Sequence, residues 1–149
     1  MKNFTTAVLA LLLSATFGFA QKTETVQQKL FAEFPNSVEV SKTVLSELFK
    51  ATAGEQVAVP FNDKFVFRGK VMSNQVKYAN LQTMLLQYEN GNGTLFQLSK
   101  ITNKDNSISY TGRIINPSAL EVFEIKNDIA DNYSLCKISL DRILQDCSY

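Results

Sequence analysis

The sequence contains no histidine and no tryptophan, and it has only two cysteines and three prolines. Histidine is the one side chain whose ordinary pKa lies near neutral pH, so its absence excludes Ser-His and Cys-His nucleophile systems. The common zinc sites are excluded with them, because two cysteines cannot hold a structural zinc ion by themselves. We therefore expect neither a metal centre nor a cofactor.

An excess of charge of one sign is also lacking, since 15 Lys and Arg residues stand against 14 Asp and Glu residues. A balanced chain offers no electrostatic reason to bind nucleic acid or an anionic membrane. Eleven Phe and five Tyr residues favour instead a β-rich core filled by aromatic rings. We expect no nucleic-acid partner.

Long hydrophobic runs are confined to residues 1–20, which read as a secretory signal. Lys2 precedes an apolar stretch at residues 7–13, and the segment ends with small residues at Gly18 and Ala20. A transmembrane anchor is the alternative, but the apolar run is too short to cross about 30 Å of hydrocarbon. We expect cleavage near Ala20 and a secreted single domain, residues 21–149, without a membrane span.

Two helices are expected before the strands begin. Residues 25–34 have apolar side chains at helical spacing, and Pro35 ends that helix. A second helix, opened by Ser37 or Ser41 and closed by Gly54, carries one apolar stripe made of Val40, Val44, Leu45, Leu48 and Phe49.

Alternating segments separated by turn residues follow, and they predict an antiparallel β-meander. Residues 56–60 form a short edge strand ended by Pro60, and about six strands lie between residues 64 and 139. Phe65, Phe67, Gly69 and Val71 share the face expected to be buried, and Gly69 indicates a bulge or a closely approaching backbone. The predicted class is α+β, with the N-terminal helices packed on the sheet. The alternative is an up-and-down β-barrel with a helical plug.

Cys136 and Cys147 survive signal removal, and in an exported protein an even pair favours a disulfide over two free thiols. The short loop would contribute about 2–3 kcal/mol by restricting the unfolded chain. The spacing is not that of a redox-active Cys-x-x-Cys motif.

Polar turns and one basic strand face are the candidate binding surfaces. The turns contain Asn90, Asn92, Asn103, Asp105, Asp128 and Asp131. Residues 127–132 are also a weak calcium candidate, although Asx-turn capping explains the same side chains. The basic face consists of Lys64, Arg68 and Lys70. It could meet an acidic partner, or it could be a solvated face that protects an edge strand.

Paired carboxylates and an apolar cavity are the remaining possibilities for chemistry. Glu121 and Glu124 lie on opposite faces of a strand, and Asp141 and Asp146 are more simply solvated, so no catalytic residue is assigned. An apolar ligand could be enclosed by Phe65, Phe67, Tyr110 and Phe123, although the same rings suit a plain core.

Several motifs resemble those of small uncharacterised secreted proteins of Bacteroidota: Val57-Ala58-Val59-Pro60, the strand at residues 65–71, Tyr110-Thr111-Gly112-Arg113-Ile114-Ile115 and the terminal Cys147. Residues 40–71 also faintly resemble the start of propeptides of secreted metalloproteases. Neither resemblance carries a known catalytic residue onto this sequence, and the second implies at most a detached propeptide-like or inhibitor-like module.

The expected function is therefore that of a secreted, non-enzymatic binding module for a protein or cell-surface component. A carrier of an apolar small molecule and an inhibitor of a secreted protease are the alternatives. Loops on a stapled β scaffold are where binding would take place.

Intact-mass measurement of the protein exported by its host tests the export and disulfide expectations together. The observed mass should match a chain that begins at Gln21, and reduction should add two hydrogen atoms. An unchanged mass on reduction would contradict the pairing of Cys136 with Cys147, and a mass that includes residues 1–20 would contradict cleavage.

Overall fold

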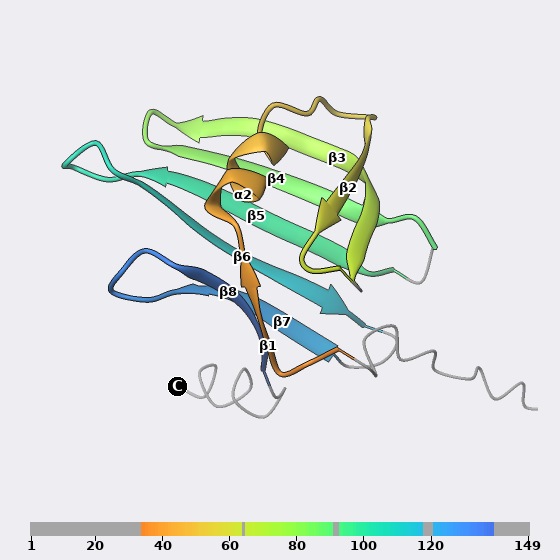
Figure 1. Ribbon diagram of the computed structural model, residues 1–149. Coiled ribbons are helices and arrows are strands. Elements are labelled where there is room, and N and C mark those ends of the chain that lie inside the picture. The colour runs from red at the N-terminus through yellow and green to blue at the C-terminus, as the bar shows by residue number, and fades with distance from the viewer. Residues whose placement is uncertain (1–33, 64, 91–92, 118–120, 139–149) are drawn as a thin grey trace, which may run out of the picture.

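The computed structural model describes residues 34–63, 65–90, 93–117 and 121–138. These residues form one antiparallel sheet of eight strands and one short helix, α2 (Lys42–Leu48) (Figure 1). The strands are β1 (Ser37–Val40), β2 (Gln56–Pro60), β3 (Val66–Tyr78), β4 (Leu81–Tyr88), β5 (Leu95–Thr102), β6 (Ile108–Asn116), β7 (Glu121–Asn127) and β8 (Tyr133–Ile138).

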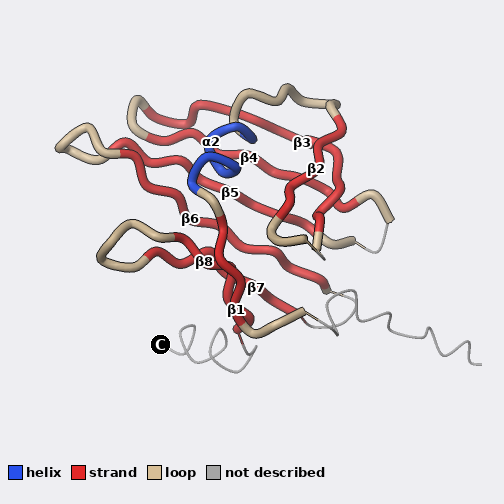
Figure 2. Tube along the Cα trace, in the orientation of Figure 1, coloured by secondary structure: helices blue, strands red, loops and turns tan. Residues whose placement is uncertain are grey.

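The sheet curls into a half-barrel whose two edges are β1 and β2. From β2 to β8 each strand pairs with the next, whereas β1 pairs with β8 at the far end of the order. The chain then crosses from one edge to the other through α2, which lies over the concave side between β1 and β2 (Figures 1 and 2). No helix of the described residues is long and apolar enough to cross a membrane.

The predicted α+β class is wrong, because the described chain is mostly β. Ser37–Val40 is a strand, and α2 ends at Leu48 instead of continuing to Gly54. Val40 fits a helical pattern and a strand pattern. It is spaced for a helical stripe with Val44, and it also alternates with Val38, which like Val40 is buried in β1. Ser41 does cap the helix, as its Oγ accepts a hydrogen bond from the N–H of Thr43 at 3.2 Å. The helix expected at residues 25–34 lies almost wholly outside the described residues.

The strands after residue 55 occur close to where alternation predicts them, and their faces are as expected. Phe67 and Val71 are almost fully buried on the concave face, while Arg68 and Lys70 are exposed on the other face. Gly69 is explained by a close approach of the neighbouring strand and not of the helix. A Cβ atom at residue 69 would lie 2.6 Å from the carbonyl oxygen of Gln87 on β4.

A bulge at Met72 changes which residues of β3 face the core. Val71 pairs with Leu86 and Asn74 pairs with Met84, so one additional residue lies on β3 between these two inward-facing pairs. Asn74 is thereby turned to the concave side, where its Nδ2 donates to the carbonyl oxygens of Phe49 (2.9 Å) and Ala51 (2.8 Å). Its Oδ1 accepts from Nε2 of Gln82 at 2.8 Å. Asn74 therefore supplies partners for carbonyls that follow the end of α2.

Replacing this carboxamide should loosen α2 on the sheet. Asn74→Ala removes three hydrogen bonds in a half-buried place, and we expect the free energy of unfolding to fall by about 1–3 kcal/mol. Urea denaturation followed by circular dichroism measures the loss. The neighbouring exposed variant Gln75→Ala is the control, and an equal effect of both would contradict an anchoring role for Asn74.

Candidate functional site

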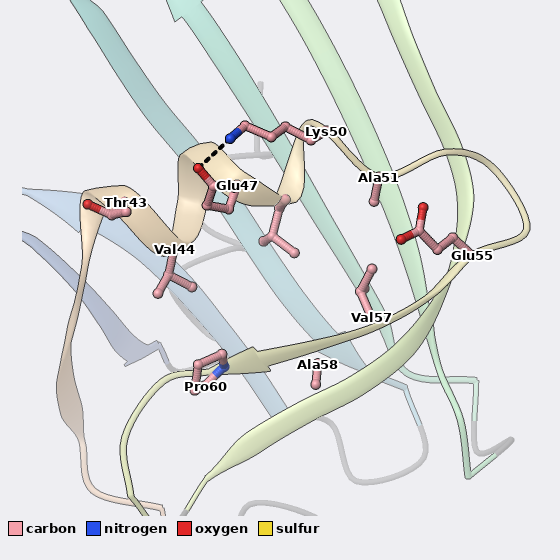
Figure 3. Close-up of a pocket in the computed structure, with 10 residues that line it drawn as sticks. Thr43, Val44, Glu47, Lys50, Ala51, Glu55, Val57, Ala58 and Pro60 are labelled. Carbon is pink, nitrogen blue, oxygen red and sulfur yellow. Dashed lines mark hydrogen bonds and ion pairs between the residues drawn. The ribbon is translucent and has the colours of Figure 1, made fainter.

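The candidate site is a groove of about 390 Å³ between helix α2 and edge strand β2. Figure 3 shows side chains of the helix on one side of it and side chains of the strand on the other. Its apolar lining comes from Val44, Leu48, Ala51, Val57, Ala58 and Pro60.

Among the described residues, some backbone hydrogen-bonding groups of β2 do not pair with β3 and lie at the edge beside this groove. The N–H of Val71 donates to the Glu55 carbonyl at 2.9 Å, and that of Phe61 donates to the Phe65 carbonyl at 3.0 Å. In an antiparallel pair, backbone groups of alternate residues face the partner strand, so these two bonds show that the odd-numbered residues of β2 hydrogen-bond to β3. The backbone groups of Gln56 and Ala58, and the carbonyl of Pro60, therefore face away from β3, at the free edge of the sheet.

The charged groups at the groove have partners that hold them at its rim. Nζ of Lys50 lies 2.6 Å from Oε1 of Glu47, one turn earlier on the helix (Figure 3). Oε2 of Glu55 accepts from the N–H of Thr52 at 3.0 Å. The carboxylates of Glu47 and Glu55 thus have partners at the rim of the groove. Its floor consists of apolar side chains and the edge of β2.

A second groove, of about 530 Å³, lies near the other edge strand and is mainly polar. Its lining includes Phe61 and the ion pair between Lys42 and Asp131, which joins the start of α2 to the loop between β7 and β8. The hydrogen bond from Lys42 holds the pKa of Asp131 below its usual value, and the same bond raises the pKa of Lys42. Lys42 and Asp131 satisfy each other here, whereas the Glu39 side chain at the same groove has no ion pair among the described residues.

The predicted binding turns do not form one surface. Asn103 and Asp105 lie in the loop between β5 and β6, at the same end of the sheet as the loop with Asp128 and Asp131 (Figure 1). Asn90 lies at the opposite end, in the turn after β4. Asn92 lies outside the described residues. A single partner therefore cannot contact all the predicted turns through one face.

The carboxylates of Asp105 and Asp128 stabilise their own turns, whereas that of Asp131 pairs with Lys42. Oδ1 of Asp128 accepts from the N–H groups of Ala130 (2.8 Å) and Asn132 (2.9 Å), and hydrogen bonds led by that of the Asn132 side chain lower the pKa of Asp128. Hydrogen bonds from the Ser107 side chain and backbone likewise lower the pKa of Asp105. The described residues include no group of three or more His, Cys, Asp or Glu side chains suited to a metal ion. The geometry matches Asx turns.

The predicted disulfide and basic face are each only partly described. Cys136 is half-buried on β8, with its Sγ 3.4 Å from the hydroxyl oxygens of Ser37 and Ser134. Burial raises the pKa of the Cys136 thiol, but the hydrogen bonds with Ser134 and Ser37 outweigh it, and the net pKa is lowered. Cys147 lies outside the described residues, so the pairing stays a prediction. Arg68 and Lys70 are exposed on β3, whereas Lys64 also lies outside.

The carboxylates considered for catalysis are separated, as expected from their spacing. Glu124 pairs with Arg113 on the outer face at 2.8 Å, whereas Glu121 is 5% exposed and pairs with Lys137 at 3.3 Å. Across from Glu121 lies Asn116, which is fully buried. Within the described residues, its carboxamide atoms and the second oxygen of Glu121 have no hydrogen-bond partner. None of the grooves described above is lined by this pair. Asp141 and Asp146 lie outside the described residues.

The groove residues were not among the binding residues predicted from the sequence, although several were named there as parts of the helical stripe and the edge strand. The one sequence signal for them was Pro60, which marked residues 56–60 as an edge strand. The helix side was hidden, because Val44 and Leu48 were assigned to a buried stripe. Leu48 is buried, but Val44 is half-exposed and forms the wall of the groove.

The ion pair of Lys42 and Asp131 should give a pH-dependent contribution to stability. Because the pKa of Asp131 is lowered on folding, its contribution is present at neutral pH and is lost as the pH falls below about 4. We expect Asp131→Asn to lower the thermal midpoint at pH 7 and to have little effect at pH 2. Ile129→Ser in the same loop is the control, and an equal Asp131→Asn effect at both pH values would refute the pair.

Comparison with known proteins gives no match, so the function is inferred from the groove. Neither a family model, nor a curated protein, nor a solved structure matches this chain. The resemblances to secreted proteins of Bacteroidota and to metalloprotease propeptides therefore stay predictions made from sequence motifs.

Proposed function

We propose that this chain is a secreted, non-catalytic binding module that takes up an extended segment of a partner protein along the free edge of β2. The observation that carries the proposal is the alternation of β2, which turns the backbone groups of Gln56 and Ala58 towards an apolar groove. An added strand would hydrogen-bond to these groups and place every second side chain under α2. Export is supported by the signal-like residues 1–20.

Two features make this edge more suitable for binding than an ordinary sheet edge. The helix lies across the groove from this edge, so an incoming strand would bury side chains against Val44 and Leu48 as well as pairing its backbone. Pro60 lacks an N–H, so pairing would end there and the register of the added strand would be limited. Affinity would come from the backbone and selectivity from the groove.

The packing of the interior favours this function over a carrier. The Phe67 ring centroid lies 5.7 Å from that of Phe96, and the Phe34 ring lies 5.0 Å from that of Phe123. Four grooves along the described residues are lined by other side chains and not by Phe65, Phe67, Tyr110 or Phe123. The rings therefore contact one another in the way expected of a filled core.

Blocking the edge should abolish binding without unfolding the sheet. Ala58→Pro removes an N–H that does not bond to β3, and proline is tolerated on edge strands. A fluorescent peptide of alternating Val and Ser should bind the wild-type mature chain and protect the Gln56 and Ala58 amides from hydrogen exchange. Titration with peptide to about 1 mM detects binding with a free energy of about 4 kcal/mol or stronger.

The matched control places proline on the other edge strand. The backbone of Glu39 faces away from β8, so Glu39→Pro should fold and should bind the peptide like the wild type. Absence of binding to the wild type, equal binding by Ala58→Pro, or protection confined to other strands would each contradict the proposal.

A further inference from the structure

Two cations lie one strand in from the free edge of β2. Arg68 pairs in register with Ala58, and Lys70 pairs with Gln56, so each cation shares the outer face of the sheet with its partner on β2. Arg68, Lys70 and Gln56 are all exposed. The outer face beside the proposed binding edge is therefore basic.

Neither cation is neutralised within the part of the chain that the structure describes. The described ion pairs use Lys42, Lys50, Arg113, Lys126 and Lys137, and none uses Arg68 or Lys70. Glu89 follows β4 next to Arg68, and its backbone N–H donates to the Arg68 carbonyl at 3.1 Å. Its side chain is exposed as well, and none of the described ion pairs joins it to Arg68. Both side chains are thus available to a carboxylate of another molecule.

The geometry of an added strand determines which of its side chains would meet these cations. Residues placed opposite Ala58 and Gln56 would project to the outer face, about 10 Å in backbone spacing from Arg68 and Lys70. Arginine and lysine side chains can extend over the small Ala58 to approach them. Residues placed opposite Val57 and Val59 would project to the other face, towards Val44 and Leu48 in the groove.

We infer that the partner segment alternates acidic side chains with apolar ones, an inference that rests on the proposed strand addition. The acidic side chains would pair with Arg68 and Lys70, and the apolar ones would fill the groove below α2. A second copy of this chain is less suitable, because its β2 would offer Gln56, Ala58 and Pro60 to the outer face, without a carboxylate. The occupant we commit to is a different protein with an acidic, extended segment. Strand β1 of a second copy also alternates the exposed Glu39 with Val38 and Val40, so the sedimentation test below distinguishes that copy from a different protein.

Three soluble peptides that differ in one residue type test the inference on the mature chain. Each alternates Val with Asp, Ser or Lys, and affinity is measured by fluorescence anisotropy at low and high salt. We expect the Asp peptide to bind most tightly and the Lys peptide most weakly. We also expect the difference between them to shrink at high salt, because the cations are exposed.

Variants that each remove one positive charge test whether Arg68 and Lys70 cause the preference for the Asp peptide. Arg68→Gln and Lys70→Gln should each weaken binding of the Asp peptide by about two- to fivefold, which is the range for exposed ion pairs. Neither variant should change the affinity for the Ser peptide. Lys104→Gln, at an exposed loop position outside the groove, is the control and should change neither affinity.

The outcomes separate this inference from the proposed function. If the three peptides bind equally and only Ala58→Pro abolishes binding, the acidic partner is wrong although strand addition stands. If no peptide binds, the proposed function fails. If sedimentation shows a dimer that Ala58→Pro dissociates, the occupant is a second copy and the inference is overturned.

Discussion

The carboxamide of Asn74 holds α2 against the sheet, and the groove depends on that contact. A helix of seven residues is too short to be stable by itself, so its position is determined by what it packs on and by its ends. Leu45 and Leu48 bury its inner side, and Asn74 bonds to the carbonyls that follow its last turn. Because the chain then turns through Gly54, at φ +94°, into β2, the same contact also places the edge strand beneath the helix.

The two edge strands of the sheet, β1 and β2, differ in what surrounds them. An exposed edge invites pairing with other chains, and proteins usually limit it with short strands, proline or a covering element. β2 has five residues, ends in Pro60 and faces α2 across the groove, and the first two of these features restrict random association. At β1 the Lys42 and Asp131 pair lies across the neighbouring groove. These contrasts single out β2 as the edge suited to a selective partner.

The separation of the polar turns limits where binding can take place. The turns that contain Asp105 and Asp128, at one end of the half-barrel, are stabilised by their own Asx and hydroxyl hydrogen bonds, which explains their composition without a ligand. Their carboxylates have lowered pKa values for the same reason. The basic residues Arg68 and Lys70, by contrast, have no such internal role among the described residues, and they adjoin the groove.

The sequence by itself determined the strands after residue 55, the buried face of Phe67 and Val71, the polar turns and the edge character of residues 56–60. These features depend on the alternation of neighbouring side chains and on turn chemistry, which can be recognised within a few residues. Only the tertiary structure decided that Ser37–Val40 pairs with β8, where Ser37 and Cys136 are 99 positions apart, because such a pairing leaves no local pattern. The bulge at Met72, the early end of α2 and the groove itself likewise depend on how distant backbones approach one another.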